Sequence, residues 1–380
     1  MCKSTAFHAI VSHEDLLWNS AGEYFDEGWE YFRRGQLKVA KASMEAALDS
    51  YQQLEDSARV NVANCLTSIG CVLEQQGRLQ EALEYHDQAR ETYQQLDPTS
   101  QNLAASYNNI AIVLQIQGRC DEALELFRRA RVIQEALDPE SLDAAATYSN
   151  IGMVLMEQCK YLEAQVMFCQ ARSIQEQLAP NGLDLAVTLT NMGELLHSWE
   201  PQQQQQQQQP ADVLDQSLQL YKRAQEIREQ LAPNSLPLAI VFRDISNIWR
   251  DQGKCLQATG LLRRALAIQQ RIAPDSLDVA KTLKDLAKVQ KRQRKYAESL
   301  ETARKATSIL LQPHIGIILS HPVHIQVRLV EADVCYELGD YQGAIEAATI
   351  VLNVLTQNET AACILGRSLQ AMHNSGQAIV

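Results

Sequence analysis

A proline-containing segment recurs along the chain at nearly constant intervals. Its marker residues are Pro98, Pro139, Pro180, Pro233 and Pro274, separated by 41, 41, 53 and 41 residues. The one longer interval holds a 12-residue insertion around the run PQQQQQQQQP. A fixed period of this size is typical of stacked supersecondary units, each burying its apolar face against its neighbours. We therefore expect an array of repeats rather than independent globular domains.

Each period divides into two helical segments separated by a turn residue. The turn residues are Gly35, Gly77, Gly118, Cys159, Glu200, Gly253, Arg294 and Gly339. Small side chains recur seven positions before the turn residue and five and twelve positions after it. Small residues at helical spacing let two helix axes approach closely, so each period is predicted to be a helix pair.

The residues around each proline predict where helices end and begin. Proline lacks a backbone N–H and clashes with the preceding turn, so it ends the second helix of a pair. A serine follows the proline by two positions in four periods and is well placed to cap the next helix. These serines are Ser100, Ser141, Ser235 and Ser276.

Composition supports a mostly helical chain. Of the 380 residues 46% are hydrophobic, which is enough to build a core, and there are only 16 Gly and 10 Pro. The formal net charge of −12 is a poor field for attracting phosphate backbones, so we expect no nucleic-acid partner.

The nine cysteines are dispersed without a CxxC pair, which is typical of reduced, intracellular proteins. With no signal peptide and no long apolar run, we expect a cytoplasmic protein without membrane insertion.

These paired helices ending in proline resemble tetratricopeptide repeats. The 41-residue period is similar to the long repeats of kinesin light chains and nephrocystin-like proteins. The resemblance implies an all-α, right-handed superhelix, or α-solenoid, of about eight helix pairs. We place an N-terminal extension at 1–15, the array at 16–358 and a C-terminal capping helix and tail at 359–380.

The resemblance also implies a function. A tetratricopeptide array is expected to be a non-enzymatic scaffold that binds peptide segments of partner proteins in its concave groove. A regulatory subunit or fragment of a signalling protein, or a motor–cargo adaptor, remains an alternative. The glutamine insertion at 201–210 is interpreted as a flexible segment at a solvent edge, with a partner-binding tract as the alternative.

The sequence carries no recognisable catalytic chemistry. It contains no GxGxxG, GxxxxGK[ST], GxSxG or HExxH motif, so we expect neither an enzyme nor a bound cofactor. His321 and His324 have a ligand-like spacing, but no carboxylate or thiol between them completes a metal site. We interpret this run as a loop between helix pairs.

Candidate binding residues lie on the first helix of each pair. Asn109, Asn150 and Asn191 recur at 41-residue intervals, and Asp244 and Asp285 occupy the same position in later pairs. The resemblance implies that first helices line the concave face, where the three amides match the asparagine ladder of kinesin-light-chain-type domains. Such amides can bind both the N–H and the C=O of a peptide backbone. Alternatively, these polar residues only solvate a groove or cap neighbouring helices.

One predicted helix is strongly basic. Lys281, Lys284, Lys288 and Lys291 recur at i, i+3, i+7 and i+10 and so form one stripe in an otherwise acidic chain. The stripe is either a solvated face or a site for an acidic peptide or a C-terminal carboxylate. The complete set of candidate groove residues is Asn108, Asn109, Asn150, Asn191, Arg243, Asp244, Lys281, Lys284, Asp285 and Lys288.

Overall fold

The protein is built from sequential α-helices. The computed structural model describes residues 13–203, 210–315 and 319–375, and this part holds seventeen α-helices and two short 3₁₀ helices, η1 (Glu55–Ala58) and η2 (Pro313–Ile315). The first helices of the successive pairs are α1 (His13–Arg33), α3 (Arg59–Gln75), α5 (Gln101–Ile116), α7 (Leu142–Glu157), α9 (Leu183–Gln203), α11 (Leu236–Asp251), α13 (Leu277–Arg292) and α15 (Pro322–Glu337). The second helices are α2 (Leu37–Gln52), α4 (Leu79–Leu96), α6 (Cys120–Leu137), α8 (Tyr161–Leu178), α10 (Pro210–Leu231), α12 (Cys255–Ile272), α14 (Tyr296–Leu310) and α16 (Tyr341–Val354). A last helix, α17 (Glu359–Ser375), follows the eighth pair. The predicted all-α class and the eight pairs are confirmed.

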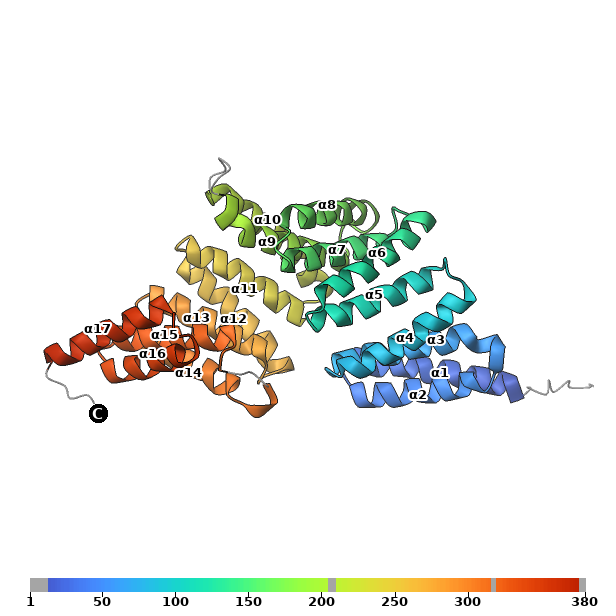
Figure 1. The fold of residues 1–380 in the computed structure, drawn as a ribbon, viewed down its shortest axis with the longest axis horizontal. Coiled ribbons are helices and arrows are strands. Elements are labelled where there is room, and N and C mark those ends of the chain that lie inside the picture. Colours follow the sequence, from blue (N-terminus) through green and yellow to red (C-terminus); the bar gives the residue numbers. More distant parts are fainter. Residues whose placement is uncertain (1–12, 204–209, 316–318, 376–380) are drawn as a thin grey trace, which may run out of the picture. The chain divides into compact units, whose positions relative to one another are not determined.

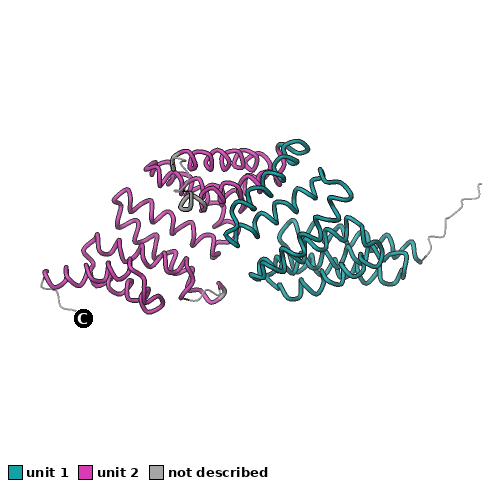
Figure 2. The backbone as a smooth tube through the Cα atoms, turned by 45° about the horizontal axis from the view of Figure 1, so that its top comes forward, with its two compact units in different colours: residues 1–180 teal, residues 181–380 magenta. Residues whose placement is uncertain are grey.

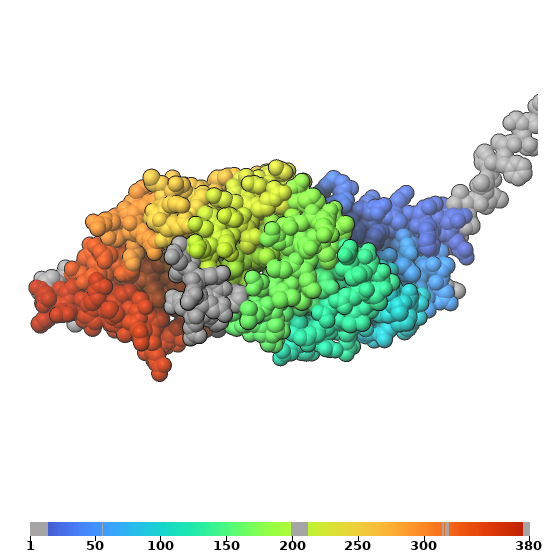
Figure 3. Space-filling view, turned by 90° about the horizontal axis from the view of Figure 1, so that it is seen from above, coloured from blue at the N-terminus to red at the C-terminus, as the bar shows by residue number. Residues whose placement is uncertain are grey.

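The helices form two compact units, residues 1–180 and 181–380 (Figures 1 and 2). Within each unit, a first helix packs on the second helix of its own pair, and that helix packs on the next first helix. First helices also contact one another: α3 contacts α5 and α5 contacts α7 in unit 1, and α11 contacts α13 and α13 contacts α15 in unit 2. The last helix, α17, contacts α15. Within each unit, neighbouring colours adjoin in the space-filling view, as this order requires (Figure 3). We call the surface made by the first helices the inner face.

The predicted turn residues are confirmed in seven of the eight pairs. The five glycines among them have φ between 73° and 77°, a left-handed conformation that glycine adopts without strain. Cys159 and Arg294 take the same conformation, with φ of 58° and 60°. The prediction for Glu200 was wrong, because this residue lies inside α9, which continues to Gln203. The glutamine tract itself falls mainly on residues 204–209, which lie outside the described residues.

The helix ends also follow the local chemistry of the sequence. Each of α4, α6, α8, α10 and α12 ends two residues before its marker proline. All four predicted serine caps are present: each Ser Oγ accepts a hydrogen bond from the backbone N–H three residues later, as from Ala144 to Ser141 at 3.2 Å. Short loops of fixed length therefore keep successive pairs in register.

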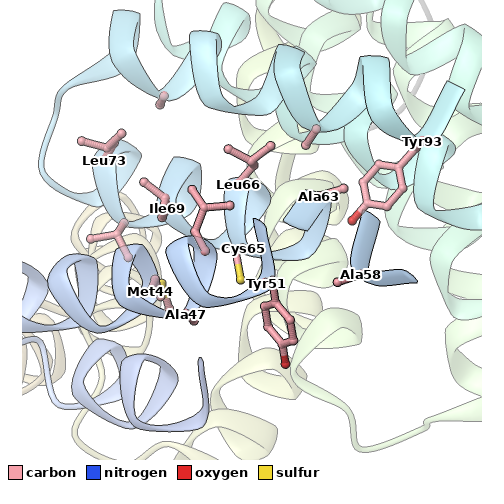
Figure 4. Close-up of a cluster of buried hydrophobic side chains, with 14 of the residues drawn as sticks. Met44, Ala47, Tyr51, Ala58, Ala63, Cys65, Leu66, Ile69, Leu73 and Tyr93 are labelled. Carbon is pink, nitrogen blue, oxygen red and sulfur yellow. The ribbon is translucent and has the colours of Figure 1, made fainter. Parts of the chain in front are cut away.

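The core consists of clusters of apolar side chains packed between neighbouring helices within each unit. In unit 1 the side chains of Met44 on α2 and Cys65 and Ile69 on α3 are fully buried and face one another (Figure 4). Within several pairs a glycine on the first helix leaves room for a large ring on the second. A Cβ atom added at Gly152 would lie 2.7 Å from Phe168, and one at Gly193 would lie 2.9 Å from Tyr221. This ring-on-glycine contact sets the distance between the two helices of a pair.

The contact predicts that one Gly→Ala substitution destabilises the protein while another stabilises it. Gly152→Ala should lower the free energy of unfolding by about 1–2 kcal/mol, because overpacking against Phe168 outweighs the better helix propensity of alanine. Gly260→Ala, on α12 where an added Cβ meets no atom within 4 Å, should raise it by up to about 1 kcal/mol. Urea unfolding of both variants measures the difference. Equal effects at the two sites would contradict the ring-on-glycine model.

None of the helices in the described part of the chain has the length and apolar character needed to cross a lipid bilayer.

Candidate functional site

A polar groove runs across the inner face of unit 2. It consists of three adjoining pockets of about 320, 330 and 410 Å³. The first lies among α9, α10 and α11, the second mainly between α11 and α13, and the third mainly among α11, α13 and α15. Shared lining residues connect them: Arg243, Asp244 and Asn247 line the first and second, and Arg250 and Lys288 line the second and third. We call this surface the unit 2 groove.

Seven of the ten predicted site residues line this groove. They are Asn191, Arg243, Asp244, Lys281, Lys284, Asp285 and Lys288. Asp244 on α11 and Asp285 on α13 occupy equivalent positions in their pairs, and these two helices are in contact. The repeat period therefore brings residues 41 positions apart onto one surface.

The basic stripe on α13 is mostly paired within the protein. Lys281 lies 3.4 Å from Asp278, and Lys284 donates to Gln326 at 3.0 Å and lies 3.4 Å from Asp285. Lys288 differs, because it has no hydrogen bond or ion pair with any described residue. Burial and the neighbouring Lys284 lower the pKa of Lys288. One lysine of the stripe is thus held partly desolvated without a partner.

Asp244 is an unusual carboxylate at the middle of the groove. Burial raises its pKa to about 7, and the negative charges of Glu194 and Asp285 add to this effect, whereas Arg243 opposes it. The guanidinium of Arg243 approaches Asp244 at 3.5 Å and Asp278 at 3.9 Å. Asp244 therefore exchanges its proton near neutral pH, and the charge of the groove changes with it.

The remaining three candidate residues belong to unit 1. Asn109 on α5 and Asn150 on α7 are half-buried, and their side chains make no hydrogen bond within the described residues. Asn108 is already engaged, because its Nδ2 donates to Thr147 Oγ1 on the next first helix at 2.7 Å. Asn109 and Asn150 keep their hydrogen-bonding capacity for other molecules, while Asn108 joins α5 to α7.

Sequence reasoning missed Arg228, which lines the first pocket from α10. Its side chain is only 6% exposed, and no described residue pairs with it; burial lowers its pKa. The equivalent position in other pairs is occupied by buried neutral residues: Tyr93, Gln134, Gln175, Gln269 and Leu310. A charged residue at a repeat position otherwise neutral was the signal that could have identified it.

The two histidines with ligand-like spacing have local roles. His321 caps α15, its Nδ1 accepting from the N–H of Val323 at 3.2 Å, and the buried His324 has its Nδ1 3.2 Å from the carbonyl oxygen of Leu319. Across residues 13–203, 210–315 and 319–375, no group of three or more His, Cys, Asp or Glu side chains is arranged to hold a metal ion.

Comparison with known protein families identifies the repeat. The family described as "Tetratricopeptide repeat" matches residues 31–95, 72–136, 102–177 and 246–312, together more than half of the chain. No curated protein sequence matches the chain significantly.

Solved structures with similar folds are available. BtubC (BKLC) from P. vanneervenii matches with a TM-score of 0.50 and 20% identity, covering 62% of this chain and 92% of that one. The apo form of RapI matches with a TM-score of 0.56 and 18% identity, covering 76% and 97%. TPR-like repeats from Podosopora anserina, described as those of a kinesin light chain, match with a TM-score of 0.42 and 18% identity over 56% and 96%. At these identities the two matches with TM-scores of 0.50 and 0.56 show the fold alone.

Proposed function

Because the chain belongs to the tetratricopeptide repeat family, whose arrays generally act as protein-binding scaffolds, we propose that the unit 2 groove binds a peptide segment of a partner protein. The segment is extended or partly helical, and its acidic side chains meet the lysine stripe of α13. The family is typically non-enzymatic, and the groove is an open polar surface suited to contacts along a chain rather than to enclosing a reaction.

The observation that carries this proposal is the unpaired Lys288 at the junction of two pockets. Its neighbours Lys281 and Lys284 have partners inside the protein, so the stripe is not simply a solvated basic face. Asp285 and Asp251 lie near enough to act on the charge of Lys288, and a carboxylate from a peptide would add the direct ion pair that Lys288 lacks among the described residues. Partial desolvation strengthens such a contact relative to one on an open surface.

Asn109 and Asn150 support a second contact region on the inner face of unit 1. Their helices α5 and α7 are adjacent, and each amide offers both a donor and an acceptor. In this proposal the two side chains bind the backbone of a partner peptide without reading its sequence. Each neutral hydrogen bond is worth about 0.5–1.5 kcal/mol.

The proposal predicts that charge at Lys288 controls affinity for acidic peptides. Peptides selected by display on the full chain should lose about 3–10-fold in affinity for Lys288→Gln, mainly through slower association, since a half-exposed charge steers a ligand more than it holds it. The matched control is Lys305→Gln on α14, an exposed lysine of a second helix paired with Glu301. Calorimetry and stopped-flow binding at two salt concentrations measure both quantities.

The same peptides separate the two regions. The double variant Asn109→Ala/Asn150→Ala should lower the affinity of peptides that contact unit 1. It should leave the affinity of peptides that depend on Lys288 unchanged. If the Lys288, Lys305 and asparagine variants all bind the selected peptides as tightly as the unaltered chain, the inner face is not the binding surface.

A further inference from the structure

The first pocket of the unit 2 groove contains two buried hydrogen-bond donors without partners. Arg228 on α10 is 6% exposed and Asn191 on α9 is 9% exposed, and both line the pocket. Arg228 Nε and Asn191 Nδ2 make no hydrogen bond with any of the described residues. The pocket has a volume of about 320 Å³, enough to admit a carboxyl group together with the side chain that bears it.

An unpaired guanidinium at this depth is costly to the folded protein. A buried charge destabilises a fold unless an opposite charge or hydrogen bonds compensate it. The carboxylates of Glu194 and Asp244 line the same pocket, yet neither forms an ion pair with Arg228, and Asp244 pairs with Arg243 instead. Other pairs place tyrosine, glutamine or leucine here, so the fold does not need an arginine at this position.

We propose that this pocket binds a carboxylate of the partner peptide, with Arg228 and Asn191 donating hydrogen bonds to its oxygens. The inference rests on the proposed function and adds to it a recognition point distinct from the lysine stripe. A planar guanidinium fork matches the two oxygens of a carboxylate. The nearby Glu194 and Asp244 disfavour a dianionic phosphate, so a singly charged carboxylate fits better.

The chemistry of the pocket can be tested without any peptide. Acetate is titrated into the full chain at constant ionic strength, and the Arg228 Nε resonance is followed by NMR, with assignment from Arg228→Lys. Acetate should shift this resonance to saturation, whereas acetamide should not, and inorganic phosphate should act more weakly.

Arg228→Leu and Arg228→Gln, which install the residues used at this position by other pairs, should raise the melting temperature of the unliganded protein. Acetate should protect the unaltered chain against thermal unfolding and leave both variants unaffected.

Peptides then identify the source of the carboxylate. For display-selected peptides, Glu→Gln, Asp→Asn and C-terminal amidation are compared on the unaltered chain and on Arg228→Gln. One of these peptide changes should lower the affinity for the unaltered chain about tenfold or more. The same change should not lower the affinity for Arg228→Gln. Asn191→Leu should weaken the same peptides.

The outcomes separate the two proposals. The carboxylate pocket is overturned if acetate does not shift the Arg228 Nε resonance, or if phosphate shifts it more than acetate does. This holds even if peptides bind elsewhere in the groove. A lower melting temperature for Arg228→Leu and Arg228→Gln also overturns it, because Arg228 would then be stabilising the fold. If acetate binds but no peptide depends on Lys288 or Arg228, the unit 2 groove is not a peptide-binding site, although its first pocket still binds a free carboxylate.

Discussion

Removing residues 359–380 is expected to lower the free energy of unfolding of unit 2 by about 3–6 kcal/mol and to cause aggregation. Helix α17 packs on α15 and α16, where Ala361, Ile364 and Met372 are buried. Without it, the apolar side chains of Ile325 and Val351 become exposed. An uncovered apolar face at the end of a stack recruits other chains.

The control for this truncation is the shorter deletion of residues 376–380, which keeps all of α17. It should leave the melting temperature and the monomer fraction in light scattering unchanged. A chain lacking 359–380 that melts at the original temperature and stays monodisperse would show that α17 does not protect the array.

Acidification is expected to destabilise unit 1 by about 3 kcal/mol through a single histidine, His86. Its ring is fully buried against Gly70, and neither ring nitrogen has a partner among the described residues. Burial lowers the pKa of His86 from 6.5 to about 4. Between pH 6.5 and 4 the unfolded chain therefore binds a proton at His86 that the folded chain does not bind. The free energy of unfolding is highest above pH 6.5 and falls as the pH drops toward 4.

His86→Phe tests this directly, because Phe127 and Phe168 occupy the equivalent position in the next two pairs. The variant should be at least as stable as the unaltered chain at pH 7.5, since it buries no unsatisfied nitrogen, and should lose the dependence between pH 6.5 and 4. Hydrogen exchange in α3 and α4 across this range measures the effect. Replacing the exposed His373 by Gln is the control and should leave the profile unchanged. An unaltered pH profile in His86→Phe would assign the acid sensitivity to other groups.

The elements that the sequence predicts well are those set by one residue and its nearest neighbours. A serine placed two residues after a proline caps a helix by its own hydroxyl, and Ser141 does so. A glycine between two helices needs only its own backbone freedom, as Gly118 shows. Repetition makes such signals stronger, because the same local chemistry occurs several times in a single chain. It also identified Cys159 and Arg294 as turn residues although neither is glycine.

The elements that the sequence predicts poorly depend on contacts between pairs. The lysine stripe was visible on α13, but the partners of Lys284 and Lys291, Gln326 and Asp333, lie 42 residues further along on α15. Which lysine remains unpaired follows only from that packing. Period counting also misplaced the turn at Glu200, because it assumes a constant helix length and the insertion lengthens both helices of the fifth pair.

That lengthening has a consequence for how the chain can vary. Helices α9 and α10 have 21 and 22 residues, whereas α11 and α12 beside them have 16 and 18. The extra turns are at the ends joined by the insertion, while the ends near Pro180 and Pro233 keep the ordinary spacing. We expect residues gained or lost at this point to leave the spacing of the Pro180 and Pro233 ends unchanged. The length of the glutamine run is therefore expected to be less constrained by the fold than the length of the short loops around the marker prolines.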